Sequence, residues 1–455
     1  MAPKAESVVE FALLAALGLA LPFANFPLVV WRGFGIDPSH VVAGALVLVG
    51  AGRLLRDRAG IRRPPGMLLA GALLASPLLA YAFRRLPGFS DSAFWRSFVH
   101  LAFWLAVYAV VASCAVSERR VSTLLGLLAC EGLILGLYGA WQTIAFARGW
   151  PTGVSFLDRL ARERLRGSSD LGVWRATATF EEPKWLAIYL SFTAVYAYAR
   201  AVRARALGGK VSVAFWLAVV LATALSVTFT ASVGGIAIMA LLLLAMAVHF
   251  IASLRSSRVM AFAFCAALAG AVGAWVWVAP GSLATLLRTR FHAVIQSLPG
   301  QSGFNASYTS AWRYERNARY AVKMFEESPL LGIGLGQFAP VGAIRGRELG
   351  FSPRDTRDPW VGWLAWIAET GLVGAAILAT LLAVILRRSW RVLQPILNPY
   401  TILTSFLVFA VVAKETHSAF YVTFWTWYPL GVAALSARIA GGWRVEEKHF
   451  ENVAT

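Results

Sequence analysis

The apolar stretch VGGIAIMALLLLAMAVHFIAS (residues 233–253) decides the fold class of this chain. A helix of that length crosses a hydrocarbon core about 30 Å thick, because it rises about 1.5 Å per residue. Similar stretches recur along all 455 residues, of which 58% are apolar and only 14% charged. A soluble domain carries roughly a quarter charged residues. The sequence therefore predicts an all-α, polytopic integral membrane protein.

We expect about twelve membrane-spanning helices, each centred on one apolar stretch. The predicted spans are 7–31, 38–55, 65–83, 94–115, 122–147, 184–202, 211–230, 233–253, 259–279, 359–386, 397–413 and 417–437. The first is kept as a span, because it is long and lacks an obvious small-residue cleavage site. The three cysteines, Cys114, Cys130 and Cys265, all lie in apolar stretches, so neither a disulfide framework nor a metal cluster is predicted.

Basic residues divide unevenly between the two sets of short loops. With the N-terminus inside, 20 of them fall inside and 5 fall in short outer loops. Because short cytoplasmic loops collect Lys and Arg, both termini are predicted to be cytoplasmic. The net charge of +19 then reflects topology and does not indicate nucleic acid as a partner.

The remaining 17 of the 42 basic residues lie in two long outer loops, 148–184 and 280–361. Long loops do not follow the positive-inside bias, so this charge needs another cause. One explanation is a solvated face or contact with anionic lipid headgroups. The other, which we favour, is a pocket for a phosphate-bearing ligand, since guanidinium groups bind phosphate oxygens in a bidentate manner. The chain is otherwise interpreted as one membrane domain, 1–455, with loop 280–361 inserted between the ninth and tenth spans.

Loop 280–361 contains RYERNARYAVK (313–323) followed by SPLLGIGLGQF (328–338). Arg313, Arg316 and Arg319 recur at helical spacing, as expected of a diphosphate-binding stripe or of an amphipathic helix on the membrane surface. The glycines that follow predict a tight loop that re-enters near helix ends. They do not indicate a nucleotide site, because no strand–turn–helix context surrounds them.

Three further segments place polar residues at the outer ends of predicted spans. They are TATFEEPKWLA (177–187), TFTASVGG (228–235) and DPWVGWLAWIAETGLVG (358–374). In the last, Asp358 is expected to cap a helix, and Glu369 is an ionisable group inside an apolar helix. Glu369 is therefore either a functional residue or a structural hydrogen-bond partner. KETH (414–417) adds Glu415 and His417 at the outer membrane edge.

These segments together resemble the O-antigen ligase and polymerase (Wzy/WaaL-like) superfamily. The helix entry TFEEPKWLA (179–187) is similar to the family's F-x-N-P-N-x-L-A. Arg313 with the turn 328–338 is similar to its R…P-L-L-G-x-G-x-G-x-F, and 358–374 corresponds to its H-N-x-x-L-x-x-x-x-E-x-G-L-x-G. The resemblance implies a GT-C type glycosyltransferase in the inner membrane of a bacterium that uses undecaprenyl-diphosphate-linked glycans.

The chain departs from the family pattern at four positions. The family's catalytic histidine and the asparagine after it fall at Trp360 and Val361, the arginine after its seventh span falls at Val233, and its helix-entry asparagine is Lys184. The resemblance implies that a base activates the acceptor while cations stabilise the departing diphosphate. The candidate bases are Asp358, Glu369, Glu415 and His417. The candidate donor-binding residues are Arg175, Lys184, Arg313, Arg316, Arg319 and Arg357.

The sequence thus predicts a metal-independent glycosyltransferase, without a cofactor, that polymerises repeat units of an exopolysaccharide or O-antigen on the periplasmic face. One alternative is a ligase that transfers the glycan to lipid A-core. Alternatives of another class are a transporter of lipid-linked sugars and a non-catalytic scaffold. A transporter should show a polar path and pseudo-repeated halves, whereas Glu131 and Glu369 are the charged residues well placed within spans. The expected partners are the lipid-linked donor, a glycan or lipid acceptor, membrane lipids and other polysaccharide assembly proteins.

Overall fold

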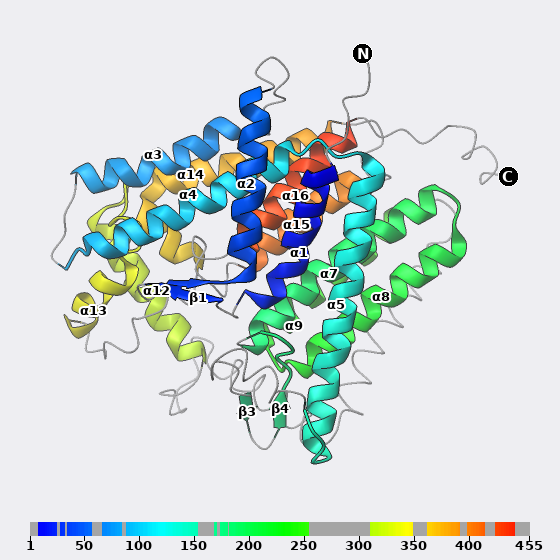
Figure 1. The fold of residues 1–455 in the computed structure, drawn as a ribbon. Helices are drawn as coiled ribbons and strands as arrows, with labels where there is room; N and C mark the ends of the chain where they lie inside the picture. Colours follow the sequence, from blue (N-terminus) through cyan, green and yellow to red (C-terminus); the bar gives the residue numbers. More distant parts are fainter. Residues whose placement is uncertain are drawn as a thin grey trace.

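The computed structural model describes residues 8–24, 28–31, 34–56, 66–83, 88–152, 168–170, 173–180, 182–253, 310–348, 362–391, 398–414 and 424–441. Helices dominate this part of the chain and pack into one bundle (Figure 1). The elements, in chain order, are α1 (Val8–Ala20), η1 (Leu21–Phe23), β1 (Val29–Trp31), β2 (Phe34–Ile36), α2 (Pro38–Arg56), α3 (Met67–Phe83), α4 (Asp91–Ser113), α5 (Glu118–Ala147), β3 (Ser168–Asp170), β4 (Val173–Arg175), α7 (Pro183–Ala206), α8 (Lys210–Phe229), α9 (Val233–Ala252), α12 (Ser310–Glu327), α13 (Phe338–Glu348), α14 (Gly362–Trp390), α15 (Pro399–Lys414) and α16 (Phe424–Ala440).

The helical class is confirmed, and within the described ranges five helices are long and apolar enough to cross a membrane. They are α4, α5, α8, α9 and α14. Three shorter apolar helices cover Val8–Phe23, Met67–Phe83 and Pro399–Lys414. The predicted span 259–279 lies outside the described residues. The count of twelve spans and the GT-C architecture stay predictions.

The first predicted span, 7–31, is wrong in its last third. Helix α1 ends at Ala20, and η1 follows with Pro22 in its first turn. Proline lacks the amide hydrogen that an α-helix needs beyond its first turn. The chain then forms an antiparallel hairpin in which Val29 pairs with Ile36. A second antiparallel hairpin pairs Ser168 with Arg175. These two short hairpins were not expected of an all-α chain.

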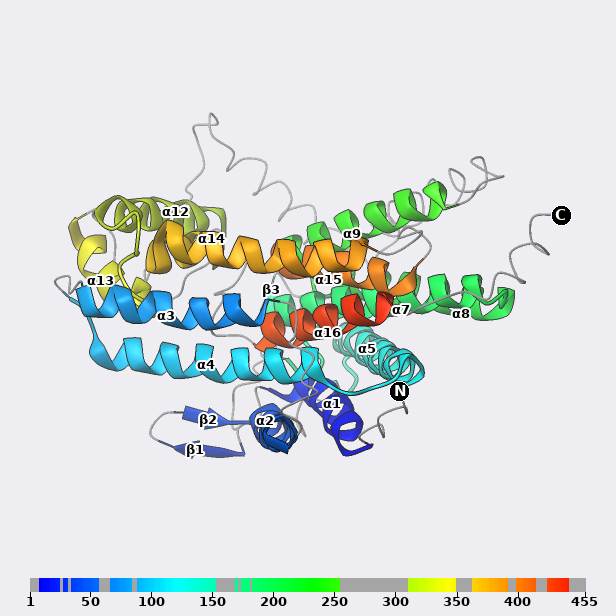
Figure 2. The ribbon, with the colours of Figure 1, turned by 90° about the horizontal axis from the view of Figure 1, so that it is seen from above.

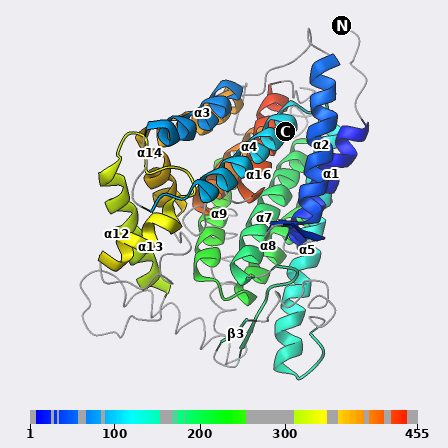
Figure 3. The same ribbon diagram turned by 60° about the vertical axis from the view of Figure 1, so that its left-hand side comes forward.

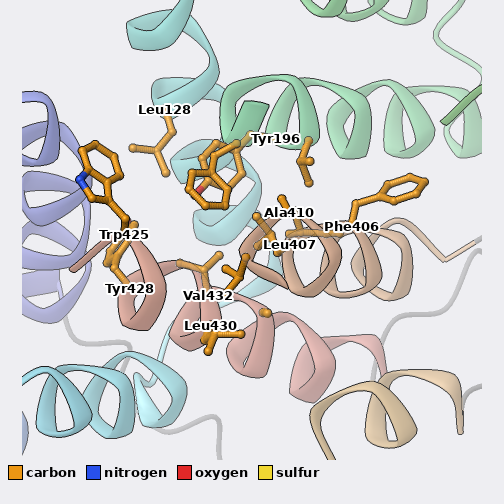
Figure 4. Packing of buried hydrophobic residues seen from close by; sticks show 14 of the residues in the cluster. Leu128, Tyr196, Phe406, Leu407, Ala410, Trp425, Tyr428, Leu430 and Val432 are labelled. Atoms are coloured by element: carbon orange, nitrogen blue, oxygen red, sulfur yellow. The ribbon is translucent and has the colours of Figure 1, made fainter. Parts of the chain in front are cut away.

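Helix α7 lies at the centre of the bundle. Every residue from Leu186 to Ala199 is buried, and α5, α8, α9 and α15 contact it. Figure 4 shows part of the apolar core beside it, where Leu128, Tyr196, Leu407 and Tyr428 meet from four helices. A helix that is buried all round in this way is shielded from lipid by its neighbours.

A glycine stripe on α5 lets this helix approach α7 closely. A Cβ atom at Gly132 would overlap the side chain of Thr193, and one at Gly136 would lie 3.2 Å from Leu190 Cδ2. Small residues four apart bring membrane helices into close van der Waals contact, which drives their association where lipid is as apolar as the helix surface. The stripe therefore fixes the end of α7 that carries the polar entry segment.

Charged side chains join the helix ends at one end of the bundle, which we call the proximal end. Arg53 on α2 pairs with Glu10 on α1 at 2.9 Å, and Arg203 on α7 pairs with Glu118 on α5 at 2.7 Å. Arg438 on α16 donates to the carbonyl of Cys114. The residues predicted to share one side of the membrane therefore gather at one end. Which face of the membrane this end occupies stays a prediction.

The opposite, distal end holds the ends of α1, α5, α8 and α15 and the starts of α7, α9 and α16 (Figures 1 and 2). The segment predicted as a long loop, 280–361, contains two helices in its described part. Helix α12 packs against α14, and Figure 3 shows α12 and α13 beside it.

Candidate functional site

The turn between α12 and α13, residues 328–337, is bound to a break in α14. At Gly371 the backbone leaves the helix, with φ 65° and ψ −169°. Backbone hydrogen bonds of 2.9–3.1 Å replace the helical ones lost at the break. The amides of Ile333 and Gly334 in the turn donate to the carbonyls of Ala368 and Glu369. The amides of Leu372 and Val373 donate to the carbonyls of Pro329 and Leu330 in the turn. The turn and the broken helix therefore form one hydrogen-bonded unit.

The side chain of Glu369 stabilises this hydrogen-bonded unit. It is fully buried, Oε1 accepts from the amide of Phe338 at 2.7 Å, and Oε2 accepts from the amide of Gly336 at 3.0 Å. Of its two predicted roles, catalytic base and structural hydrogen-bond partner, this geometry favours the second. A carboxylate with both oxygens on backbone amides holds a loop in place.

The glycines of the turn permit the close approach. Gly332 has φ 73°, and a Cβ atom there would overlap the backbone of Glu369 and Thr370. Gln337 ties the other side of the turn to the start of α4, since its amide accepts from Ser90 N at 2.8 Å and donates to Ser90 O at 2.9 Å. The prediction that these glycines bring a tight loop close to helix ends is thus confirmed.

The predicted arginine stripe lies on α12. Arg313, Arg316 and Arg319 all fall within this helix, and the side chain of Arg319 is exposed. On the same helix, Tyr320 and Met324 are fully buried and pack in a cluster with the turn and with α14. The structure describes no side chain for Arg313 or Arg316. The docked turn therefore sets the position of the helix that carries all three arginines.

A second polar unit joins the entry of α7 to the turn between α8 and α9. Arg175 Nε donates to Thr230 O at 3.1 Å, and Ala176 N donates to Phe229 O at 3.0 Å. Arg175 and Ala176 directly precede segment 177–187, so these bonds join the start of that segment to segment 228–235. Ala178 and Ala231, one in each segment, have φ angles of 48° and 45°. Such left-handed backbone costs an alanine roughly 1–2 kcal/mol, and strained residues of this kind cluster at functional sites.

Gln142 on α5 holds the strained entry segment. It is fully buried, and its Oε1 accepts from the amides of Thr177 at 3.3 Å and Ala178 at 2.8 Å. Thr179 donates to the carbonyl of Pro22 at 2.8 Å, which fixes the next residues to η1. Sequence reasoning did not single out Gln142, although an amide inside an apolar stretch is a usable signal.

We expect Gln142→Ala to lower the melting temperature, because it leaves two buried amides unsatisfied at about 1–3 kcal/mol each. Gln142 Nε2 also donates to the carbonyl of Ala178 at 3.4 Å. Gln142→Glu keeps an acceptor, and in its protonated form also a donor, so its loss of stability should be smaller than that of Gln142→Ala at acidic pH and should grow when the buried carboxyl ionises. Thermal unfolding in detergent micelles measures both variants. Equal melting temperatures for wild type and Gln142→Ala would contradict this role.

Lys184 carries a positive charge at the start of α7. Its ammonium group pairs with the Glu182 carboxylate at 2.8 Å and lies 5.3 Å from the ring of Trp185. The side chains of Lys184 and Glu182 are 27% and 51% exposed, so solvent screens this pair and it contributes little stability. The pair can therefore open to admit an anionic ligand at small cost.

Several predicted site residues lie outside the described residues. They are Arg357, Asp358, Glu415 and His417, and Trp360 and Val361 fall there as well. Among the residues that the structure does describe, no group of three or more His, Cys, Asp or Glu side chains could hold a metal ion.

The sequence profile of one known family covers both the turn and the broken helix. Residues 216–379 match the O-antigen ligase family. This match confirms the resemblance carried by the motifs and supports membership of the O-antigen ligase and polymerase superfamily. A comparison with curated proteins finds no match.

The matched segment runs from α8 into α14 beyond the break. It includes the stripe on α12, the glycine turn and Glu369, whereas Arg175 and Lys184 precede it. The match supports activity of the O-antigen ligase and polymerase type, which implies a lipid-linked glycan and an acceptor. With the five apolar helices, it also indicates an integral membrane protein.

Proposed function

We propose that this protein polymerises undecaprenyl-diphosphate-linked repeat units of an exopolysaccharide or O-antigen on the periplasmic face of a bacterial inner membrane. One observation carries the proposal: the helix bearing Arg313, Arg316 and Arg319 is docked onto the broken helix α14 inside the matched family segment. A helix held in place in this way can present its arginines to a diphosphate while the glycan is transferred.

In the proposed reaction an acceptor hydroxyl attacks the anomeric carbon of the donor glycan. A new glycosidic bond forms, the bond from carbon to the diphosphate oxygen breaks, and the hydroxyl proton passes to a base. The leaving diphosphate is already anionic, so fixed cations can stabilise it without a metal ion. Arg313, Arg316, Arg319, Arg357, Arg175 and Lys184 are the proposed donor-binding residues.

The proposed base is one of Asp358, Glu415 and His417, because a positioned side chain assists proton transfer from a hydroxyl. Glu369 is the weakest of the four predicted candidates, since backbone amides of the turn occupy both of its oxygens. Individual replacement of the three remaining side chains would identify which one the reaction needs.

A ligase is the second candidate, since the matched family is described as O-antigen ligase. The two reactions differ in the acceptor alone. Purified protein in lipid nanodiscs should extend a lipid-linked repeat unit into a ladder of longer products on a gel. If a ladder is absent and the glycan is transferred to added lipid A-core instead, the ligase replaces the polymerase. Activity that persists in EDTA supports metal independence.

Arg313→Ala is expected to lower turnover of the donor about tenfold or more, because a charge-assisted hydrogen bond contributes roughly 1.5–3 kcal/mol. Arg119→Ala, an exposed arginine at the proximal end, is the matched control and should leave turnover unchanged. Equal turnover for Arg313→Ala and the control would contradict the proposed donor site. No turnover by wild type with any donor or acceptor would favour transport or scaffolding.

A further inference from the structure

A groove opens between α8 and α9 in the half of the bundle nearest the proximal end. Figure 2 shows these two helices diverging from the turn that joins them at the distal end. Helix α7 contacts both of them and contributes a tyrosine to the groove. The side chains that line the groove are largely apolar and include Tyr198 of α7, Leu217 and Leu221 of α8, and Leu243, Met246 and Phe250 of α9.

The hydroxyl group of Tyr198 is engaged within the protein. It donates to the carbonyl of Met246 at 2.9 Å and lies 2.7 Å from His249 Nδ1. The groove therefore offers a ligand apolar surface along its length, and a hydrocarbon chain is the ligand that gains most from covering such a surface.

The depth of the groove matches one leaflet of a bilayer. Leu221 lies eleven residues after Lys210, where α8 begins, and Leu243 lies nine residues before Ala252, where α9 ends. At 1.5 Å per residue, the groove reaches about 14–16 Å from these proximal helix ends. Half of a hydrocarbon core about 30 Å thick has the same depth. A lipid in the groove would thus come from the proximal leaflet, whereas the proposed diphosphate site lies at the distal end.

A half-buried arginine lies at the proximal mouth of the groove. Arg205 Nη1 donates to Ser253 Oγ at 2.7 Å, Nη2 donates to Ser253 O at 2.9 Å, and the guanidinium carbon lies 5.4 Å from the ring centroid of Phe250, which lines the groove. Within the described ranges Arg205 has no carboxylate partner, whereas Arg203 pairs with Glu118. A guanidinium group has five N–H donors, so donors remain for the oxygens of a phosphate.

We propose that this groove binds one anionic phospholipid of the proximal leaflet, with an acyl chain between α8 and α9 and the headgroup phosphate on Arg205. Basic residues at the mouth of a gap between membrane helices recognise anionic headgroups in this way. A zwitterionic headgroup would add a second cation beside the guanidinium group and should bind less well. The bound lipid would brace α8 and α9, whose connecting turn is tied to Arg175 and the entry of α7. The site is separate from the proposed glycan transfer and needs no donor.

The test uses the full chain in phosphatidylcholine nanodiscs, prepared with and without phosphatidylglycerol. Native mass spectrometry measures bound phosphatidylglycerol, and thermal unfolding measures the stability that it adds. Arg205→Gln removes the charge at the mouth, Arg205→Lys keeps it, and Ala247→Phe places a ring in the wall of the groove, where Ala247 is buried. Arg388→Gln and Ala379→Phe, both at exposed positions on α14, are the matched controls.

We expect phosphatidylglycerol to raise the melting temperature of wild type, of Arg205→Lys and of both controls. Arg205→Gln should bind it about tenfold more weakly, because a hydrogen bond to a charged group is lost. Ala247→Phe should lose the added stability although its arginine is intact, so it serves if Arg205→Gln does not fold. Each variant is compared with itself in the two kinds of nanodisc, which removes any change in its intrinsic stability.

Four outcomes would overturn the proposal. Equal binding by wild type, Arg205→Gln and Ala247→Phe would show lipid bound at the general surface of the bundle. Phosphatidylcholine retained as strongly as phosphatidylglycerol would exclude recognition of the anionic headgroup. Equal stabilisation by inorganic phosphate would show a site for a free anion without a chain. Displacement of phosphatidylglycerol by undecaprenyl diphosphate would assign the groove to the donor. Chain extension is scored separately, and its absence would refute the proposed function without touching the lipid site.

Discussion

Glu369→Ala is expected to lower the free energy of unfolding by about 4 kcal/mol, one of the two largest effects that we predict. The substitution strips the hydrogen-bond acceptor from two buried amides, those of Gly336 and Phe338, and each unsatisfied group costs about 1–3 kcal/mol. The turn should then separate from α14, and the helix that carries the arginine stripe should lose its position. Denaturant or thermal unfolding in detergent micelles gives the stability, and chain extension gives the functional loss.

Glu369→Gln separates this structural role from catalysis. The amide keeps one oxygen acceptor, so the loss of stability should be about half that of Glu369→Ala, and measurable turnover should remain. A catalytic base would behave in the opposite way, with turnover abolished and stability unchanged. Glu326→Gln, at an exposed position on α12, is the matched control and should alter neither quantity.

Gly371→Ala is expected to have an effect of similar size. At φ 65° and ψ −169° the backbone occupies a region that is essentially restricted to glycine, and other residues there cost of order 1–3 kcal/mol. A Cβ atom at this position would also lie 2.6 Å from the amide nitrogen of Gly332. Since that nitrogen belongs to the docked turn, the turn must move away from α14. Melting temperature and turnover should fall together.

The control for this substitution is Gly71→Ala in α3. Gly71 is exposed, and a Cβ atom there would meet no atom within 4 Å. In a helix interior alanine is favoured over glycine by about 0.5–1 kcal/mol, so this variant should be as stable as wild type or slightly more so. If Gly371→Ala behaved like Gly71→Ala, α14 could not be broken at Gly371 in the working protein.

Periodicity and apolar length predicted most of the helices, because both are local properties of the sequence. Helices α2, α5 and α9 begin and end within about four residues of their predicted bounds, the precision usual at helix ends. The hairpin Val29–Ile36 was missed because Val, Phe and Trp suit a membrane helix and a strand equally well. Pro22 and Pro27 were the sequence signals that a helix starting at Val8 could not continue through this span.

The candidate site was harder to predict from the sequence, because its contacts join residues that lie far apart in the chain. The PLLGxGxGxF and ExGLxG motifs were recognised separately. The structure shows that they are the two halves of one hydrogen-bonded unit, and this gives Glu369 a role that its position inside an apolar helix left open. The role of Gln142 becomes visible only in the structure, where α5 meets the entry segment of α7.

The burial of α7 has a consequence for the biogenesis of the protein. This helix has 24 residues, yet it is not among the five that are apolar enough to cross a membrane unaided, since it carries several arginines and hydroxyl-bearing side chains. Such a segment partitions less readily from the translocon into lipid than a helix that is apolar throughout. We expect the neighbours that cover it to assist its insertion, α5 before it in the chain and α8 after it.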